Sequence, residues 1–321
     1  MNDFYTAKEQ PWADFWDEID TVVIEDGVTS VGSYSFCSVG SNVEKIILGN
    51  TVERIGEFAF MGCEKLTELT IPDSMTNIEV CAFGSCDKLE NITLPEDFTF
   101  RGGELFDDTL WYENLQKENP LVIVNNCVID GAGCSGEVVI PDGVIAVCGG
   151  AFEYNSSITS VIIPESCTSV GLYAFSGCTE LQEIVLPEAV TEIGMDAFEE
   201  TPWYEAVKGD EPVVIINGVL LDGIDAAGDV VIPDGVRTIC YWAFLGNEGI
   251  TSVTIPESTV SIGKMSFCKC SSLTDITIMA DDCEIADNMT DPSMNAVIHG
   301  RKGSSAEQYA EINGIEFAEI K

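Results

Sequence analysis

Basic residues are scarce in this chain of 321 residues, and the scarcity restricts its partners. The sequence has 14 Lys and Arg against 55 Asp and Glu, which gives a formal net charge of −41 at pH 7. A field of that sign and size repels nucleic acid and anionic lipid, so both are excluded as partners. It favours a soluble, self-repelling monomer and attracts cations or basic proteins.

Histidine and long apolar runs are nearly absent as well. His299 is the only histidine, so the count excludes histidine-based catalytic triads and histidine-rich metal sites. The sequence has no Gly-x-Ser-x-Gly motif, and its many carboxylates form no specific catalytic pair. It has no run of about 18 apolar residues that would span a membrane. These absences predict a chain with no enzyme activity, no cofactor and no membrane insertion.

What the chain has instead is a repeat of 23 residues. Its first mark is an aliphatic residue followed by proline, at Ile71–Pro72, Leu94–Pro95, Ile140–Pro141, Ile163–Pro164, Leu186–Pro187, Ile232–Pro233 and Ile255–Pro256. Its second mark is a phenylalanine about 12 residues after the aliphatic position, at Phe36, Phe60, Phe83, Phe152, Phe175, Phe198, Phe244 and Phe267. β-Branched residues before each proline favour a strand, and proline ends it because it has no N–H to donate. Since so short a turn cannot bury its apolar face alone, neighbouring turns must stack around the phenylalanines. The repeat therefore predicts a continuous solenoid with one short strand per turn in a long parallel sheet, and few helices.

A longer period of 92 residues lies above this repeat. The pattern Thr-x-Trp-Tyr-Glu begins at Thr109 and again at Thr201. We expect atypical turns near 106–137 and 198–229, each with a short helix capped by the threonine and followed by a β-hairpin. The helix tryptophans, Trp111 and Trp203, are expected to pack down onto the solenoid.

The repeat resembles that of the BspA-like, or treponemal-type, leucine-rich repeat family. Residues Leu181–Gly194 fit the family pattern Leu-x-x-Ile-x-Ile-Pro-x-x-Val-x-x-Ile-Gly closely, as do Leu66–Pro72, and the resemblance covers about 20–317. It implies a right-handed, β-rich leucine-rich repeat solenoid with a parallel sheet and few short helices. It also implies a bacterial cell-surface or secreted protein tied to adhesion, with no catalytic residues. The expected partner is a protein, such as one on a host or neighbouring cell.

The two ends of the chain also resemble the family. Residues 1–19 look like the remnant of an N-terminal cap, 20–296 like the solenoid, and 297–321 like a C-terminal cap. In that cap, Ser304 and Glu307 predict a capping box, and a glycine predicts the end of the helix. Since Met1 begins no recognisable signal peptide, we expect an export signal outside this chain and an extracellular or cell-surface location.

The strands predict an outward face with two columns of side chains. Because side chains alternate along a strand, one column is polar and mostly acidic, and the other is β-branched. The first column supplies the candidate partner-binding face, Glu68, Asn91, Glu137, Ser160, Glu183, Asp229, Ser252 and Asp275. Five of these eight residues are acidic, so a basic or cation-bridged partner is expected. Neither column contains an aromatic anchor, which predicts modest affinity.

The 13 cysteines are interpreted as structural free thiols. Cys63, Cys86, Cys178 and Cys270 each follow a core phenylalanine by three residues. The 92-residue period also exchanges cysteine with valine and alanine, as expected of a small buried hydrophobe. The odd count and the lack of any Cys-x-x-Cys argue against disulfides and zinc.

Two local motifs imitate ligand sites. Residues Gly131–Gly136 match Gly-x-Gly-x-x-Gly, but a strand follows where a dinucleotide site needs a helix, so a hairpin turn is predicted. Asp281–Glu284 with Asp287 offer oxygen ligands for calcium, yet their spacing fits no EF-hand. A solvated loop is the favoured interpretation of the second motif.

The sequence leaves two functions open. The first is a non-catalytic surface or secreted repeat protein that mediates adhesion or protein–protein interaction. The alternative is a passive spacer or accessory module of a larger secreted enzyme. A wall anchor or a catalytic domain in the flanking sequence would discriminate the two.

Overall fold

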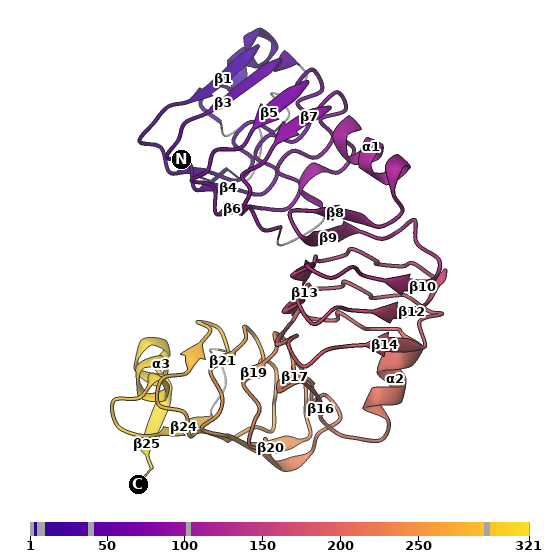
Figure 1. The fold of residues 1–321 in the computed structure, drawn as a ribbon. Helices are drawn as coiled ribbons and strands as arrows, with labels where there is room; N and C mark the ends of the chain where they lie inside the picture. The colour runs from indigo at the N-terminus through magenta and orange to yellow at the C-terminus, as the bar shows by residue number, and fades with distance from the viewer. Residues whose placement is uncertain (1–2, 5–9, 38–41, 101–103, 292–295, 321) are drawn as a thin grey trace. The chain divides into compact units, whose positions relative to one another are not determined.

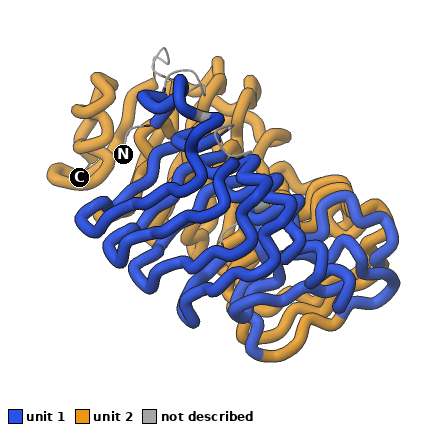
Figure 2. The backbone as a smooth tube through the Cα atoms, turned by 90° about the horizontal axis from the view of Figure 1, so that it is seen from above, with its two compact units in different colours: residues 1–138, 143–158 blue, residues 139–142, 159–321 orange. Residues whose placement is uncertain are grey.

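The computed structural model describes residues 3–4, 10–37, 42–100, 104–291 and 296–320. The chain forms β-solenoid turns in two compact units (Figures 1 and 2). Unit 1 comprises Met1–Val138 and Gly143–Ile158, and unit 2 comprises Val139–Asp142 and Thr159–Lys321. The predicted fold class, a leucine-rich repeat solenoid rich in parallel strands with few short helices, is confirmed.

Unit 1 contains two kinds of strand. The longer strands are β1 (Thr21–Ile24), β3 (Lys45–Leu48), β5 (Glu68–Thr70), β7 (Asn91–Thr93) and, at the boundary with unit 2, β10 (Gly136–Val139). The two-residue strands are β2 (Ser30–Val31), β4 (Arg54–Ile55), β6 (Asn77–Ile78) and β11 (Ala146–Val147). Equivalent residues of successive turns pair in parallel, as Val22 does with Ile46.

Unit 2 repeats the arrangement. Its longer strands are β12 (Ile158–Ile162), which begins at the boundary, β14 (Glu183–Val185), β18 (Gly228–Val231), β20 (Ile250–Ile255), β22 (Asp275–Ile278) and β24 (Val297–Gly300). Its short strands are β13 (Ser169–Val170), β15 (Glu192–Ile193), β19 (Thr238–Ile239), β21 (Ser261–Ile262) and β23 (Glu284–Ile285). The prediction of one strand per turn was therefore wrong, because in most turns a second, two-residue strand follows the longer one and pairs with its equivalents in separate sheets. Two-residue strands are too short to show the alternation by which a sequence reveals a strand.

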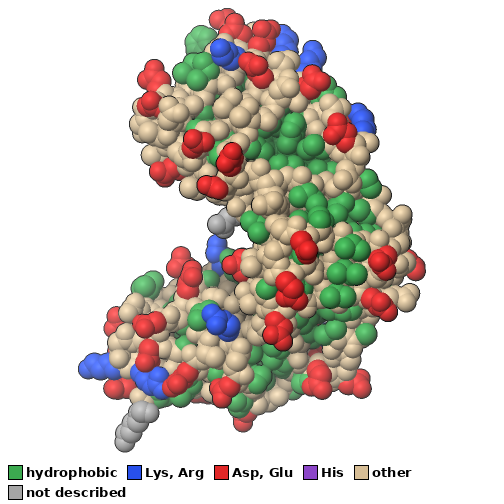
Figure 3. Space-filling view, viewed as in Figure 1, with side chains coloured by type: hydrophobic (Ala, Val, Ile, Leu, Met, Phe, Trp, Pro, Cys, Tyr) green, Lys and Arg blue, Asp and Glu red, His purple; other side chains and the backbone are tan. Residues whose placement is uncertain are grey.

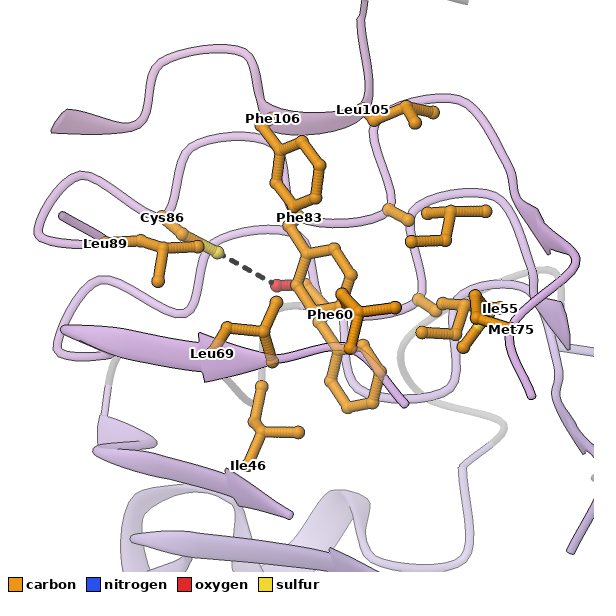
Figure 4. Close-up of a cluster of buried hydrophobic side chains, with 14 of the residues drawn as sticks. Ile46, Ile55, Phe60, Leu69, Met75, Phe83, Cys86, Leu89, Leu105 and Phe106 are labelled. Carbon is orange, nitrogen blue, oxygen red and sulfur yellow. Dashed lines mark hydrogen bonds between the residues drawn. The ribbon is translucent and has the colours of Figure 1, made fainter. Parts of the chain in front are cut away.

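Stacked phenylalanines form the core of each unit, as predicted. In unit 1 the ring centroids of Phe36, Phe60, Phe83 and Phe106 follow one another at 5.1, 5.3 and 5.5 Å, with nearly parallel planes. Aliphatic side chains such as Leu69 and Leu89 surround this ladder (Figure 4). The large rings fill the space between the two sheets, so each turn buries its apolar face on its neighbours.

The atypical turns contain the predicted helices and hairpins. The helices are α1 (Leu110–Glu118) and α2 (Pro202–Lys208), and the hairpins pair β8 (Val122–Val124) with β9 (Cys127–Asp130) and β16 (Val214–Ile216) with β17 (Val219–Asp222). Each N-cap threonine hydroxyl accepts a hydrogen bond from the N–H three residues later, at 3.2 Å for Thr109 and 3.0 Å for Thr201. Trp111 packs edge-on against Phe106 and Trp203 against Phe198, so both tryptophans pack onto the solenoid as expected.

The atypical turns place glycine where other turns place the core phenylalanine. A Cβ on Gly131 would lie 2.1 Å from a ring carbon of Phe152, and one on Gly223 would lie 2.2 Å from a ring carbon of Phe244. The phenylalanine of the following turn therefore occupies the space above each glycine. Residues 131–136 form the turn from β9 to β10, which are not neighbours in any sheet. The hairpin predicted at this Gly-rich motif was wrong, since the hairpin lies just before it.

The C-terminal residues form a helix and a further strand. Helix α3 (Ser305–Asn313) is capped by Ser304, whose hydroxyl accepts from the Glu307 N–H at 3.4 Å. The Glu307 carboxylate accepts from the N–H of Gly303, one residue before the cap, at 2.6 Å. Gly314 ends the helix in the left-handed region, and β25 (Glu316–Glu319) then pairs with β24. None of the described helices has the length and the apolar composition of a membrane span.

The predicted burial of the core cysteines is confirmed for Cys63, Cys86, Cys178 and Cys270. The Cys86 thiol donates to the Phe60 carbonyl oxygen one turn away at 3.4 Å (Figure 4), and Cys270 donates to the Phe244 carbonyl oxygen at 3.0 Å. Cysteine suits this position because it is small and apolar, yet donates weakly to a buried carbonyl.

Thiol titration should separate the cysteines by exposure. Burial raises the pKa of both the Cys240 and the Cys283 thiol to about 12, so both should stay protonated and unreactive at pH 8. Cys37 and Cys81 are only half-buried, and we expect them to react first with Ellman's reagent. Unfolding in denaturant without reductant should expose all 13 thiols. Recovery of several fewer thiols would reveal disulfides and contradict the free-thiol interpretation.

Candidate binding surface

The structure places the candidate partner-binding face on the outward side of the longer strands. Within unit 1, Glu68 pairs with Asn91, and Glu137 lies exposed on β10. Within unit 2, Ser160 pairs with Glu183, and a second group aligns Asp229, Ser252 and Asp275 on adjacent strands. The structure thus brings the predicted residues together in separate groups, because the sheets of the longer strands are interrupted.

The second column contributes exposed aliphatic side chains to the same face. Val139 is 55% exposed, Val185 57% and Val231 72%. Ile162 pairs directly with Val185, and Figure 3 shows hydrophobic side chains gathered over β12 and β14. Exposed apolar residues aligned on one face are typical of a contact surface, whereas isolated ones need no explanation.

Two acids of the first column already have partners within unit 2. The Asp229 carboxylate accepts from the Ser252 and Thr251 hydroxyls at 2.7 and 3.0 Å, and these bonds hold its pKa below the usual range. Hydrogen bonds from Thr274 and His299 likewise lower the pKa of Asp275. Both carboxylates therefore stay charged at neutral pH, and part of their hydrogen-bonding capacity is already used by neighbouring residues of the sheet.

A groove of about 350 Å³ opens on this face in unit 1. It lies between β3 and β5, which belong to separate sheets. Lys45, Ile47, Glu68 and Thr70 contribute to its walls. The groove gives the face local relief and combines an aliphatic side chain with charges of both signs.

In the acidic loop considered for calcium, Asp281 is paired with a neighbouring arginine. The Arg301 guanidinium donates to the Asp281 carboxylate at 3.2 Å and to the Met279 carbonyl oxygen at 2.8 Å. The described residues contain no group of three or more side chains placed to hold a metal ion. A neighbouring arginine and a buried Cys283 fit a structural turn.

A column of aromatic residues outside the two strand columns was not predicted from the sequence. Tyr34, Phe58, Tyr173 and Trp242 each stand directly before the Ala-Phe or Ser-Phe pair, with φ between 54° and 64°. Tyr34 stacks on Phe58 with ring centroids 5.0 Å apart. In unit 2, Trp242 is 43% exposed. The sequence did contain a signal, since the repeat position before the pair is rich in aromatic residues. The outward direction of these side chains depends on a left-handed backbone conformation, which no local sequence motif indicated.

Comparison with family models adds a sequence-wide match. The model described as the BspA type leucine rich repeat region matches in six copies, over residues 15–132, 113–220 and 211–291. No curated protein matches the chain.

Several solved structures are similar. A leucine rich cell surface protein from Faecalibacterium prausnitzii A2-165 shares 27% identity over 81% of this chain and 60% of its own, with a TM-score of 0.28. This chain thus spans about three fifths of that protein. The pneumococcal vaccine antigen PcpA shares 16% identity over 94% of this chain and 79% of its own, with a TM-score of 0.33. The T. pallidum leucine rich repeat protein shares 22% identity over 57% of this chain and 86% of its own, with a TM-score of 0.25.

Proposed function

Since this chain belongs to the BspA-type leucine-rich repeat family, we propose that it is a bacterial cell-surface or secreted protein that binds other proteins and has no catalytic activity of its own. Adhesion to a protein of a host or neighbouring cell is the role that fits best. The observation that carries the proposal is the outward strand face, where an acidic column runs beside exposed valines and isoleucines.

The chemistry of this face favours a basic partner. Glu68, Glu137 and Glu183 are exposed, so a basic protein surface would be attracted to it. The aliphatic column beside them offers apolar surface that a partner can bury on binding. The carboxylates speed the association by attracting a basic partner. Because long-range attraction is screened by ions, association should slow as salt is added.

The test is binding to a panel of purified extracellular host and bacterial proteins, measured by surface plasmon resonance. For a saturable partner, the variant Glu137→Lys/Glu183→Lys/Asp229→Lys should bind about tenfold or more weakly and lose most of its salt dependence. A matched variant, Asp73→Lys/Glu165→Lys/Glu188→Lys, changes the net charge equally at exposed turn positions and should bind almost as the original chain does.

Equal weakening of both variants would show attraction by net charge alone. Unchanged binding in both would show that the strand face is only a scaffold. If no protein of the panel binds saturably, the alternative of a spacer or accessory module in a larger secreted enzyme takes precedence.

A further inference from the structure

Unit 2 contains two adjoining cavities where the atypical turn interrupts the stack of short strands. In regular turns the segment before the core phenylalanine touches its neighbour closely, since a Cβ on Gly194 would lie 2.2 Å from the Leu172 backbone nitrogen. In the atypical turn this segment is shortened to two residues, Leu221 and Asp222. This shortening leaves a gap between residues 194–198 and 240–244. Beside the gap, the Cys240 thiol donates to the Ile193 carbonyl oxygen at 3.3 Å.

The larger cavity is apolar and has a volume of about 360 Å³. Its walls include Leu172, Ile193, Met195, Ile239 and Ile262. Both Leu172 and the neighbouring Tyr241 are more than half exposed, at 51% and 52%. This cavity therefore offers apolar surface that a partner side chain can cover.

The smaller cavity, of about 170 Å³, is acidic and aromatic. Asp196, Glu199, Asp222, Tyr204 and Trp242 line it. It adjoins the larger cavity, because Met195 and Tyr241 contribute to the walls of both. At about 30 Å³ for each water molecule, it holds roughly five or six waters, which is space for one long side chain.

Two of the three carboxylates of the smaller cavity, Asp196 and Glu199, are poorly compensated. Desolvation, and then the charge of Asp222, raise the pKa of Asp196; desolvation, and then the charge of Asp196, raise the pKa of Glu199. Lys208 is held by Asp222 and Asp225 at 2.9 and 3.0 Å. Among the described residues, no basic side chain forms an ion pair with Asp196 or Glu199. A cation entering the cavity would relieve this repulsion.

The aromatic wall distinguishes an organic cation from a hydrated metal ion. Trp242 is 43% exposed, and an indole face attracts Lys or Arg more strongly than other rings do. The aliphatic stem of such a side chain also packs well on methionine and aromatic surface. Carboxylates, an indole and an adjoining apolar cavity together match a cationic side chain with an apolar neighbour.

We propose that these two cavities of unit 2 bind an extended basic protein segment, with an Arg or Lys side chain between Asp196, Glu199 and Trp242 and an apolar side chain in the larger cavity. This site is separate from the strand face and does not depend on it. The first module provides a contrast, because Gly149 and Gly150 stand 92 residues before Tyr241 and Trp242. The first module keeps the acid at the position of Asp222, as Asp130, but has no aromatic residue at the positions of Tyr241 and Trp242.

The test uses an acetylated, amidated pentapeptide, Ala-Leu-Arg-Leu-Ala, with its lysine and citrulline counterparts, and titration calorimetry with the full chain. The arginine and lysine peptides should bind, and the neutral citrulline peptide should bind at least about tenfold more weakly. Asp196→Asn/Glu199→Gln should weaken binding of the cationic peptides about tenfold or more. Trp242→Gly should weaken it about threefold to thirtyfold, and glycine suits the φ of 64° at this position.

Controls separate the site from general charge. Glu188→Gln/Asp234→Asn removes two exposed acids elsewhere in unit 2 and should leave peptide affinity within about twofold, as should the strand-face variant Glu137→Lys/Glu183→Lys/Asp229→Lys. Because the pKa values of Asp196 and Glu199 are raised, both acids protonate sooner as pH falls, so binding should weaken from pH 7 to pH 5. The Asp196→Asn/Glu199→Gln variant should lose that response. Equal binding of the citrulline peptide, or equal loss in the Glu188→Gln/Asp234→Asn control, would overturn the proposal.

Discussion

Replacing Phe83 with alanine is expected to lower the free energy of unfolding by about 3–5 kcal/mol. The Phe83 ring is fully buried and stacked between Phe60 and Phe106, at 5.3 and 5.5 Å. Both neighbours are anchored in their own turns, so they cannot collapse into the cavity that the ring leaves. Urea unfolding followed by circular dichroism measures the change.

The control for this prediction is Phe15→Ala. Phe15 lies in the short 3-10 helix η2 (Ala13–Glu18) and is 56% exposed, so its loss should cost no more than about 0.5 kcal/mol. If the two variants unfold at similar urea concentrations, the stacked rings contribute no more than surface residues do, and the ladder is not what stabilises the core.

Adding a single methyl group at Gly223 should destabilise unit 2 by about 1–3 kcal/mol, with the upper end expected. A Cβ at this position lies 2.2 Å from one ring carbon of Phe244 and 2.6 Å from the next. The ring has little room to move, because it is fully buried and stacked 5.1 Å from Phe267. Differential scanning calorimetry of Gly223→Ala should show a lower melting temperature.

Two further variants identify the cause of that loss. Ala227→Ser adds one atom at an exposed position of the same turn and should have little effect. Phe244→Leu is destabilising alone, but should cost less in the Gly223→Ala background, because the smaller side chain relieves the contact. Strict additivity of the two substitutions would refute a clash between Cβ and ring.

Much of this architecture could be predicted from the sequence, because nearly every turn repeats the same pattern of core residues. The prolines and Phe83-like positions predicted the repeat, the longer strands and the ladder of rings correctly. The second sheet escaped prediction because a pair such as Ser30–Val31 is too short for alternation to be seen. Pairing across turns, rather than local sequence, makes it a strand.

The candidate sites were predictable to different degrees. The outward position of Glu183 follows from alternation along its own strand, and the structure agrees. The cavities of unit 2 could not be foreseen, because they depend on what the atypical turn omits between Asp196 and Trp242. A repeat pattern reports the residues that are present, whereas a gap appears only when stacked turns of different length are compared in space.

The last strand has a consequence for self-association. Among the described strands, β25 pairs with β24 alone, so its other edge is a template on which a second copy can extend the sheet. Glu316 and Glu319 stand exposed at the two ends of β25. Charged side chains on an edge strand discourage the addition of a further strand, so these glutamates protect the C-terminal edge of the solenoid from edge-to-edge association.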